Sequence, residues 1–329
     1  MKQQVKKKDL IAQRAQDFAM SQPALLAVLA MCIFGGFAFG PTFLSYENNL
    51  SNVLRQASLM GIAAIGVNFL FLIGARDLSI GATTALCGMI VAKLSPYGFW
   101  ISILAALAVG AAIGIMNGLI ITKLKVQPFI ATLGTQLGIR GLALLMNNEL
   151  SLPLADEAEV LRFIGRGYVF GEFLPMPAAI FIALILISIF ITRNTSFGRS
   201  LYAIGGSEEA AAMMGVRVDR SKTLAFMISG IAGAIAGIIV TGRLAAAQPG
   251  AGTGWEMTIM AAIVIGGTRV RGGVGKIEGV FFGVMFVGLI SNLINLNGTI
   301  SAFWQNIITG TILLLAVLLQ SHMEQKKEA

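Results

Sequence analysis

Few residues of this chain could perform bond chemistry. The only histidine, His322, lies in the C-terminal tail, so the apolar segments cannot assemble a histidine-based catalytic triad. Gly272-Gly273-Val274-Gly275-Lys276 is similar to a phosphate-binding loop, but Val270 stands where the first glycine is required and Ile277 replaces the Ser or Thr that follows the lysine. We expect a tight turn here, and no catalytic residue, cofactor or metal site in the chain.

The polar residues that could contact a solute are uncharged. Six amide and hydroxyl side chains lie in or beside apolar runs: Asn68, Gln127, Thr132, Thr135, Gln136 and Asn292. Such groups could donate hydrogen bonds to, or accept them from, the hydroxyls of a passing sugar. Hydrogen bonding between helices explains them equally well. These six are therefore candidate residues of a translocation path, with helix packing as the open alternative.

The elements that must position these residues are strongly apolar. Hydrophobic residues make up 56% of the 329 positions and charged residues 12%, about half the charged fraction usual in soluble domains. A bilayer crossing requires about 20 mostly apolar residues. The chain has ten apolar runs, roughly 23–43, 52–74, 78–95, 99–121, 127–146, 176–192, 223–242, 255–267, 277–297 and 302–320. The sequence predicts an all-α polytopic membrane protein with about ten transmembrane helices, of which 255–267 is the shortest.

Basic residues predict the orientation of these helices. If both termini are cytoplasmic, 18 of the 24 lysines and arginines fall on the cytoplasmic side, as the positive-inside rule requires. In this orientation the outer ends of spans carry Trp100, Trp255 and Trp304. This agrees with the preference of tryptophan for the membrane interface. Because the cations form short clusters between apolar runs and no single basic face, we exclude nucleic acid as a partner.

Glycines recur at four-residue spacing in three of the predicted helices. They are Gly110, Gly114 and Gly118; Gly233 and Gly237; and Gly275, Gly279 and Gly283. Small residues on one face let transmembrane helices approach closely. We expect tight packing within one subunit, and a contact between subunits is the alternative.

Two loops are long enough to have functions of their own. The predicted external loop 147–175 is net acidic and could receive a partner protein. The predicted cytoplasmic loop 193–222 contains a short helix between spans six and seven, because Ser207 can cap its N-terminus and Gly215 can end it. We expect this helix, with its alanines and two methionines, to fit a cleft in a cytoplasmic partner.

Glu209-Ala210-Ala211, followed by Gly215, resembles the Glu-Ala-Ala-x-x-x-Gly loop of bacterial ATP-binding-cassette importer permeases. Other segments resemble one branch of that family, the importers of ribose, galactose, arabinose and xylose, whose relatives carry autoinducer-2. In order, they are Asp77-Leu78-Ser79-Ile80-Gly81, Asn117-Gly118 with 127–135, Phe197-Gly198-Arg199 with 203–206, and 261–268 with Gly272-Gly273. The resemblance extends over about residues 60–290.

The resemblance implies a permease subunit in the bacterial inner (plasma) membrane. It implies a second permease copy or a paralogue, an extracytoplasmic solute-binding protein, and cassette ATPase subunits that hydrolyse the ATP, so that the permease itself is not an enzyme. The residues expected to couple to the ATPase are Arg199, Gly205, Ser207, Glu208, Glu209, Ala210, Ala211 and Gly215. The expected divisions are a cytoplasmic N-terminal tail 1–22, a transmembrane domain 23–320 and a cytoplasmic C-terminal tail 321–329.

Two positions depart from the family pattern. Thr258 stands where the family usually has an aspartate after the Glu256 segment. Arg76 stands before Asp77, where the family usually has an apolar residue. We expect the adjacent charges to neutralise each other near the inner boundary, which leaves Arg76, Asp77 and Ser79 without an assigned role.

Two other transport functions remain open. An ion-coupled secondary transporter usually holds ionisable groups deep in the membrane, whereas the middles of the predicted spans are nearly free of charge. A cassette importer permease for branched-chain amino acids is the second alternative.

Overall fold

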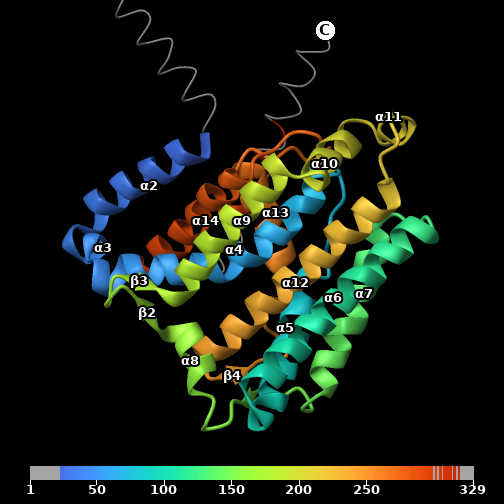
Figure 1. Cartoon of the computed structure of the whole chain (residues 1–329). Helices are drawn as coiled ribbons and strands as arrows, with labels where there is room; N and C mark the ends of the chain where they lie inside the picture. Colours follow the sequence, from blue (N-terminus) through green and yellow to red (C-terminus); the bar gives the residue numbers. More distant parts are fainter. Residues whose placement is uncertain are drawn as a thin grey trace, which may run out of the picture.

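Helices account for most of the structure (Figure 1). The computed structural model describes residues 23–298, together with 301, 304, 305, 307–312, 314, 315 and 318. The predicted all-α class is confirmed for this part of the chain. The predicted tails 1–22 and 321–329 and much of the predicted span 302–320 lie outside the described residues, so the location of the termini stays a prediction.

The long helices are α2 (Pro23–Phe39), α4 (Ser51–Leu72), α5 (Ile80–Leu94), α6 (Phe99–Lys123), α7 (Pro128–Leu145), α9 (Met176–Asn194), α12 (Val218–Leu244) and α14 (Ile277–Asn297). Shorter helical segments are α3 (Pro41–Leu44), η1 (Tyr46–Leu50), η2 (Ser95–Tyr97), α8 (Glu159–Arg166), α10 (Ser196–Gly206), α11 (Glu208–Met213) and α13 (Trp255–Ile265). Two-residue strands form antiparallel pairs, β1 (Leu152–Pro153) with β4 (Ala246–Ala247) and β2 (Tyr168–Val169) with β3 (Leu174–Pro175).

Not every predicted span is a helix long enough to cross a bilayer. Within the described residues, six helices are long and apolar enough: α4, α6, α7, α9, α12 and α14. Helix α5 has 15 residues and α13 has 11, which correspond to about 22 Å and 16 Å against a hydrocarbon core of roughly 30 Å. Irregular backbone precedes both helices, at 73–79 and 248–254. Ten complete helical crossings are therefore not established.

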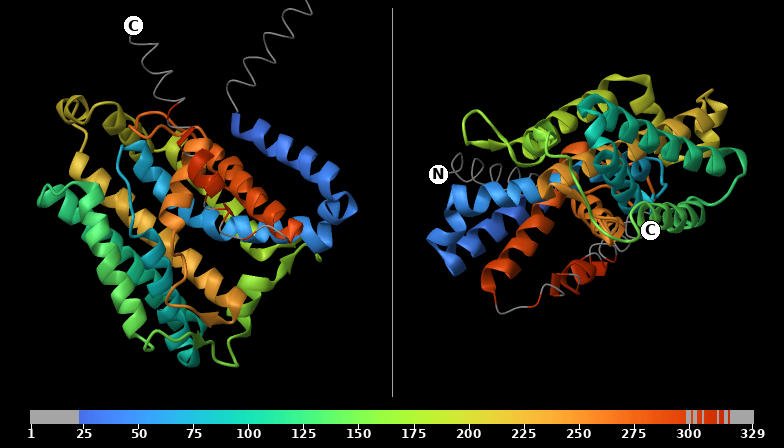
Figure 2. Two further views of the ribbon diagram at one scale, coloured as in Figure 1. Left: turned by 180° about the vertical axis from the view of Figure 1, so that it is seen from behind. Right: turned by 90° about the horizontal axis from the view of Figure 1, so that it is seen from below.

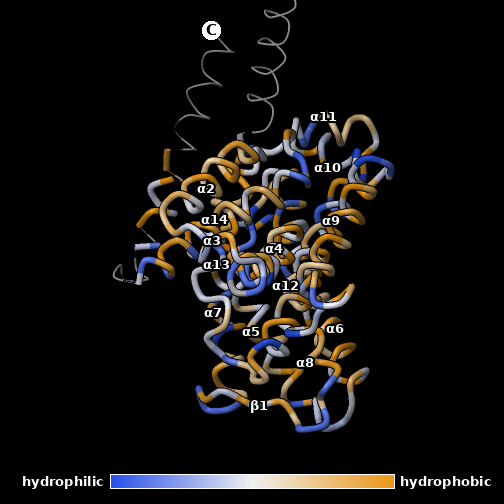
Figure 3. Tube along the Cα trace, turned by 90° about the vertical axis from the view of Figure 1, so that its left-hand side faces the viewer, coloured by the Kyte–Doolittle hydropathy of each residue, from blue (hydrophilic) through white to orange (hydrophobic). Residues whose placement is uncertain are grey.

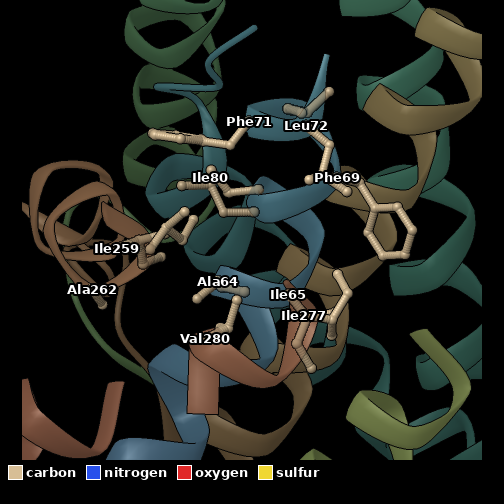
Figure 4. Close-up of a cluster of buried hydrophobic side chains, with 14 of the residues drawn as sticks. Ala64, Ile65, Phe69, Phe71, Leu72, Ile80, Ile259, Ala262, Ile277 and Val280 are labelled. Carbon is tan, nitrogen blue, oxygen red and sulfur yellow. The ribbon is translucent and has the colours of Figure 1, made fainter. Parts of the chain in front are cut away.

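The core lies around α4. The apolar part of α4 is 83% buried, whereas the corresponding parts of α6 and α7 are only 22% buried. Figure 4 shows Ala64 of α4 beside Val280 of α14, with Ile80 of α5 and Ile259 of α13 in the same buried cluster. Views from different sides show α2 and α7 on opposite flanks of the molecule (Figures 1 and 2). The central helices are thus held by protein packing, and the peripheral ones leave apolar faces for lipid or a second subunit.

Close approaches of backbone explain the repeated glycines. A Cβ at Gly110 would lie 2.5 Å from the Gly230 oxygen, and one at Gly114 would lie 2.3 Å from the Phe226 oxygen, so α6 packs directly on α12. A Cβ at Gly283 would lie 1.9 Å from the Ala262 oxygen of α13. These contacts lie within one chain, so the predicted packing within the subunit is confirmed.

The two ends of the helix bundle carry different structures. One end carries α10 and α11, and the opposite end carries α8 and the paired strands β1 and β4 (Figures 1 and 3). Hydrophilic segments gather at both ends (Figure 3). The predicted loop 147–175 is partly ordered, because α8 packs on the end of α12, where a Cβ at Gly165 would lie 2.0 Å from the Arg243 nitrogen.

Candidate functional site

A cavity of about 550 Å³ lies between α4, α13, α14, the end of α12 and the loop 248–254. Its polar lining consists mainly of uncharged amide and hydroxyl groups: Gln56, Gln248, Thr253, Thr258, Ser291 and Gln305. Trp255 and Met60 contribute apolar surface, and Arg243 is the only charged residue among its described lining residues. An aromatic wall with several neutral hydrogen-bonding groups suits a small polar solute such as a sugar.

Arg140 of α7 holds the loop that forms one wall of this cavity. Its guanidinium donates hydrogen bonds to the carbonyl oxygens of Pro249 at 2.7 Å and Ala251 at 2.8 Å. One turn earlier in α7, Gln136 donates to Glu256 Oε1 of α13 at 3.3 Å. Non-helical backbone inside a membrane is tolerated only where it is buried in protein or lines a cavity. The loop meets the second condition, because it lines the cavity. Arg140 satisfies two of its carbonyls.

Trp255, which the sequence places at the outer end of a span, lies beside the cavity. It opens α13 and lines the cavity, with its side chain partly buried against the core. The indole therefore forms part of the cavity wall, and its location at the membrane interface stays a prediction.

The six predicted path residues do not line this cavity. Thr132 and Thr135 donate to carbonyls of their own helix, and Gln127 is exposed beside the start of α7. Asn292 exchanges hydrogen bonds with Asn49, at 2.6 and 3.3 Å. Asn292 therefore matches the alternative interpretation of a contact between helical segments.

Asn68 differs from the other five residues. It is fully buried in α4, and neither its amide nitrogen nor its oxygen has a hydrogen-bond partner among the described residues. A buried polar group without a partner is costly. The structure does not place it near the cavity lining, and whether it contacts a solute stays a prediction.

Asp77 lies in a buried polar network. Its carboxylate accepts hydrogen bonds from the Ser79 backbone N–H at 2.9 Å, the Ser79 hydroxyl at 2.6 Å and the Ser229 hydroxyl at 2.8 Å. Asn117 donates to Ser79 Oγ at 3.0 Å. The network joins the segment before α5 to α6 and α12.

The expected neutralisation of Asp77 by Arg76 is wrong. No ion pair among the described residues joins the two side chains, and Asp77 is only 3% exposed. Its carboxylate turns into the bundle, where two serine hydroxyls and one N–H satisfy it. Ser79 and Asp77 therefore have a structural role that their spacing alone did not identify.

Helix α11 has the capping predicted from the sequence. The Ser207 hydroxyl accepts a hydrogen bond from the Ala210 N–H at 3.2 Å, and Gly215, with φ of +80°, ends the helix in the left-handed conformation. Glu208 forms an ion pair with Lys222 of α12 at 2.5 Å. These contacts fix the position of α11 at the end of the bundle.

The surface of α11 differs in one respect from the expected alanine face. Ala211 is fully buried, so it packs inward and offers no surface to a partner. Met213 and Met214 are 82% and 73% exposed. The outward face is therefore formed by the methionines with Glu209 and Ala212, both exposed.

Helix α10 joins α11 to the core through glycines. A Cβ at Gly205 would lie 1.9 Å from the Leu72 oxygen and 2.3 Å from the Gly273 nitrogen. The Gly273 N–H donates to the same Leu72 oxygen at 2.9 Å. Only a residue without a side chain fits between the end of α4 and the turn that precedes α14. The predicted tight turn at 272–276 is confirmed, since Gly272 and Gly273 both have positive φ.

A second contact joins α10 to this turn. The Tyr202 hydroxyl donates to the Gly275 oxygen at 3.0 Å. Burial raises the pKa of the Tyr202 phenol, and the neighbouring Glu278 carboxylate raises it further. The phenol therefore remains a neutral donor throughout the physiological pH range. Arg199, the remaining predicted coupling residue, is exposed on α10.

Comparison with known proteins gives matches over nearly the whole chain. Residues 49–317 match the family described as branched-chain amino acid transport system / permease component. The chain is 36% identical to the ribose import permease protein of Haemophilus influenzae, over 94% of this chain and 96% of that protein. It is 40% identical to the ribose import permease protein of Bacillus subtilis, over 88% of each.

A third relative has a different sugar in its name. The chain is 35% identical to the L-arabinose transport system permease protein of Escherichia coli K12, over 93% of this chain and 92% of that protein. No solved structure matches the chain.

Proposed function

The chain belongs to the family of membrane permease components of ATP-binding-cassette importers, and from this premise we propose that it carries a monosaccharide through the bacterial plasma membrane. It is a multi-pass protein of that membrane. Family membership argues against an ion-coupled secondary transporter. ATP hydrolysis belongs to partner ATPase subunits, and the permease supplies the path.

The observation that most supports a sugar substrate is the lining of the cavity. Six of its described residues present uncharged amides or hydroxyls, which can pair with sugar hydroxyls. A branched-chain amino acid would instead bring an ammonium and a carboxylate. Arg243 could pair with the carboxylate, but no described lining residue carries a negative charge for the ammonium. The relatives named for ribose and arabinose support the same choice.

Helices α10 and α11 are proposed as the contact with the ATPase. They protrude from one end of the bundle (Figure 1), and the exposed Met213 and Met214 give a flexible apolar surface suited to a cleft in a partner. At Gly205 the backbone of α10 lies directly against the backbone at the end of α4, with no side chain between them. A movement of α10 and α11 would therefore displace the end of α4. Since α4 lines the cavity, a displacement of α11 by the ATPase can change the shape of the path.

The other partners complete a working importer. We propose that an external binding protein docks on the end that carries α8, and that a second permease copy or a paralogue completes the translocation path. Residues 23–320 would form the membrane domain, with cytoplasmic tails at 1–22 and 321–329.

The cavity assignment can be tested with two glutamines. Gln248 lines the cavity, whereas Gln127 lies outside it, so the variants Gln248→Ala and Gln127→Ala make the same chemical change at two places. Each is reconstituted in vesicles with the ATPase and the binding protein, and ATP-driven uptake of ribose, arabinose and leucine is measured. We expect sugar uptake in the parent protein, a loss of about tenfold in Gln248→Ala, and little change in Gln127→Ala.

Two results would contradict the proposal in different ways. Uptake of leucine in preference to both sugars would overturn the substrate class. A loss in Gln127→Ala without one in Gln248→Ala would move the path away from the cavity, towards the residues first predicted from the sequence.

A further inference from the structure

A second hollow lies outside the candidate path, on the flank where α6 meets α12. It has a volume of about 720 Å³. Its walls are apolar side chains of the two helices and the segment before α12: Ile115, Leu119, Ala212, Val216, Val218, Leu224 and Met227. Its mouth carries Lys123, Arg217, Asp219 and Arg220. The hollow is thus an apolar groove with a charged rim at one end, and we call it the α6–α12 groove.

The glycine contacts between the two helices produce this groove. At Gly114 and Gly118 the helix axes approach so closely that a Cβ would lie 2.6 Å from the Met227 Cα and 2.7 Å from the Thr223 Cα, respectively. The larger side chains on either side of this seam cannot fit between the helices. Ile115 and Leu119 therefore stay 37% and 44% exposed beside it.

The groove is long enough to hold part of one acyl chain. From Lys123 at the end of α6 to Ile115 the helix rises by eight residues, about 12 Å. Lys123 is the last residue of a helix long and apolar enough to cross the membrane. The groove therefore runs from the bilayer surface to roughly the middle of one leaflet.

The charge at the mouth is positive. Lys123 and Lys125 both pair with Asp219, at 3.3 and 3.7 Å, and they leave one excess positive charge. Arg217 and Arg220 are exposed, and neither forms an ion pair in the part of the chain that the structure describes. Together these five side chains have a net charge of three, next to apolar walls.

The mouth also contains the start of a long helix. Helix α12 has 27 residues and no side-chain cap at its N-terminus, and Val218, Asp219 and Arg220 form its first turn. Unpaired N–H groups and the positive end of the helix dipole favour an anion at such a position. Arg217 and Arg220, which form no ion pair within the described residues, therefore lie beside the helix start at one end of the groove.

We propose that the α6–α12 groove binds one anionic phospholipid of the cytoplasmic leaflet, with an acyl chain along Ile115, Leu119 and Met227 and the phosphate between Arg217 and Arg220. Basic pockets between membrane helices on the cytoplasmic side suit such headgroups. Ala212 of α11 also lines the groove, so a bound lipid would stabilise the position of the proposed coupling helix. This site is independent of which solute the protein carries.

The test is native mass spectrometry of the purified full-length protein, alone and with its ATPase bound. Equal amounts of phosphatidylglycerol and phosphatidylcholine are added, and the lipid retained on each permease is counted. The variant Arg217→Gln/Arg220→Gln removes the two free charges. The control is Arg76→Gln/Lys276→Gln, which removes two positive charges outside the groove and outside α10 and α11. Each basic residue near an anionic lipid surface contributes about fivefold to binding, so we expect the preference for phosphatidylglycerol to fall about 25-fold in the first variant only.

Further measurements separate a lipid from other occupants. Ile115→Trp fills the deep end of the groove and should lower the retention of phosphatidylglycerol, whereas glycerol phosphate, which has no acyl chain, should not compete. The proposal is overturned if the parent protein shows no preference, if both double variants lose it equally, or if glycerol phosphate competes as well as the lipid. Displacement of the lipid by the ATPase would also overturn it, since the groove would then be part of a protein interface.

Discussion

The contact at Gly205 gives the sharpest test of how the coupling helices act on the membrane helices. In Gly205→Ala, the new Cβ would lie 1.9 Å from the Leu72 oxygen, and ordinary contact begins at 3.4 Å. Helix α10 must therefore move by about 1.5 Å, or the turn at Gly273 must yield. Such overpacking typically costs about 1–3 kcal/mol. Gly206 is the matched control, because a Cβ there meets no atom within 4 Å.

The assay compares Gly205→Ala and Gly206→Ala in the complete importer. We expect ATP hydrolysis in the absence of solute to persist in both variants, because neither residue binds nucleotide. In Gly205→Ala, ATP-driven sugar uptake should fall by about tenfold, which corresponds to roughly 1.4 kcal/mol, and thermal stability in detergent should decrease. Gly206→Ala should behave like the parent protein, or be slightly more stable, because alanine favours helix more than glycine does. Equal behaviour of the two variants in uptake and in stability would refute this reasoning.

Three further predictions follow from close packing, loop anchoring and helix capping. Gly114→Ala should lower the thermal unfolding midpoint by several degrees, since overpacking costs about 1–3 kcal/mol. Gly138→Ala should leave the midpoint unchanged, because Gly138 has open space around it. Similar midpoints for the two variants would argue against the close packing of α6 on α12. Arg140→Gln should release the loop that precedes α13, because hydrogen bonds from a charged group are worth about 1.5–3 kcal/mol each. A cysteine introduced by Thr253→Cys should then react faster with a thiol reagent. An unchanged rate would show that the guanidinium does not hold the loop. Ser207→Ala should weaken ATPase copurification several-fold, since loss of a cap costs about 1 kcal/mol of helix stability. Ser207→Asp should keep copurification at the level of the parent protein, because aspartate also caps helices. A loss of copurification in Ser207→Asp as well would mean that capping is not the cause.

The sequence predicted the membrane helices well because lipid imposes a simple rule. Long apolar runs between charges have few alternatives, and six of the ten predicted runs correspond to helices long enough to cross. The capped helix after Ser207 and the turn at Gly272 were also predicted, since both depend on local conformational preferences. The apolar run 255–267 predicted helix α13 (Trp255–Ile265). It did not show that the preceding segment 248–254 is irregular backbone that lines a cavity.

The cavity could not be predicted, for a physical reason. Its polar residues come from α4, the loop before α13, α13, α14 and Gln305, and each is an ordinary amide or hydroxyl whose neighbours are set by tertiary packing. Threonines within α7 looked equally suitable, but they bond to their own helix. Arg140 stands out in the sequence as an isolated cation in an apolar run, but its carbonyl partners lie more than 100 residues away. A weak signal for Gln248 was its place beside Pro249 and Gly250, a sequence typical of a turn.

The central claim is that this chain forms a sugar path driven by ATP hydrolysis in a partner that grips α10 and α11. The most direct measurement is sugar uptake into vesicles that contain the permease, with and without its ATPase and binding protein, while ionophores collapse all ion gradients. We expect uptake only when the ATPase, the binding protein and ATP are present together, and no effect of the ionophores. Uptake by the permease alone on an ion gradient, abolished by the ionophores and indifferent to ATP, would contradict the account.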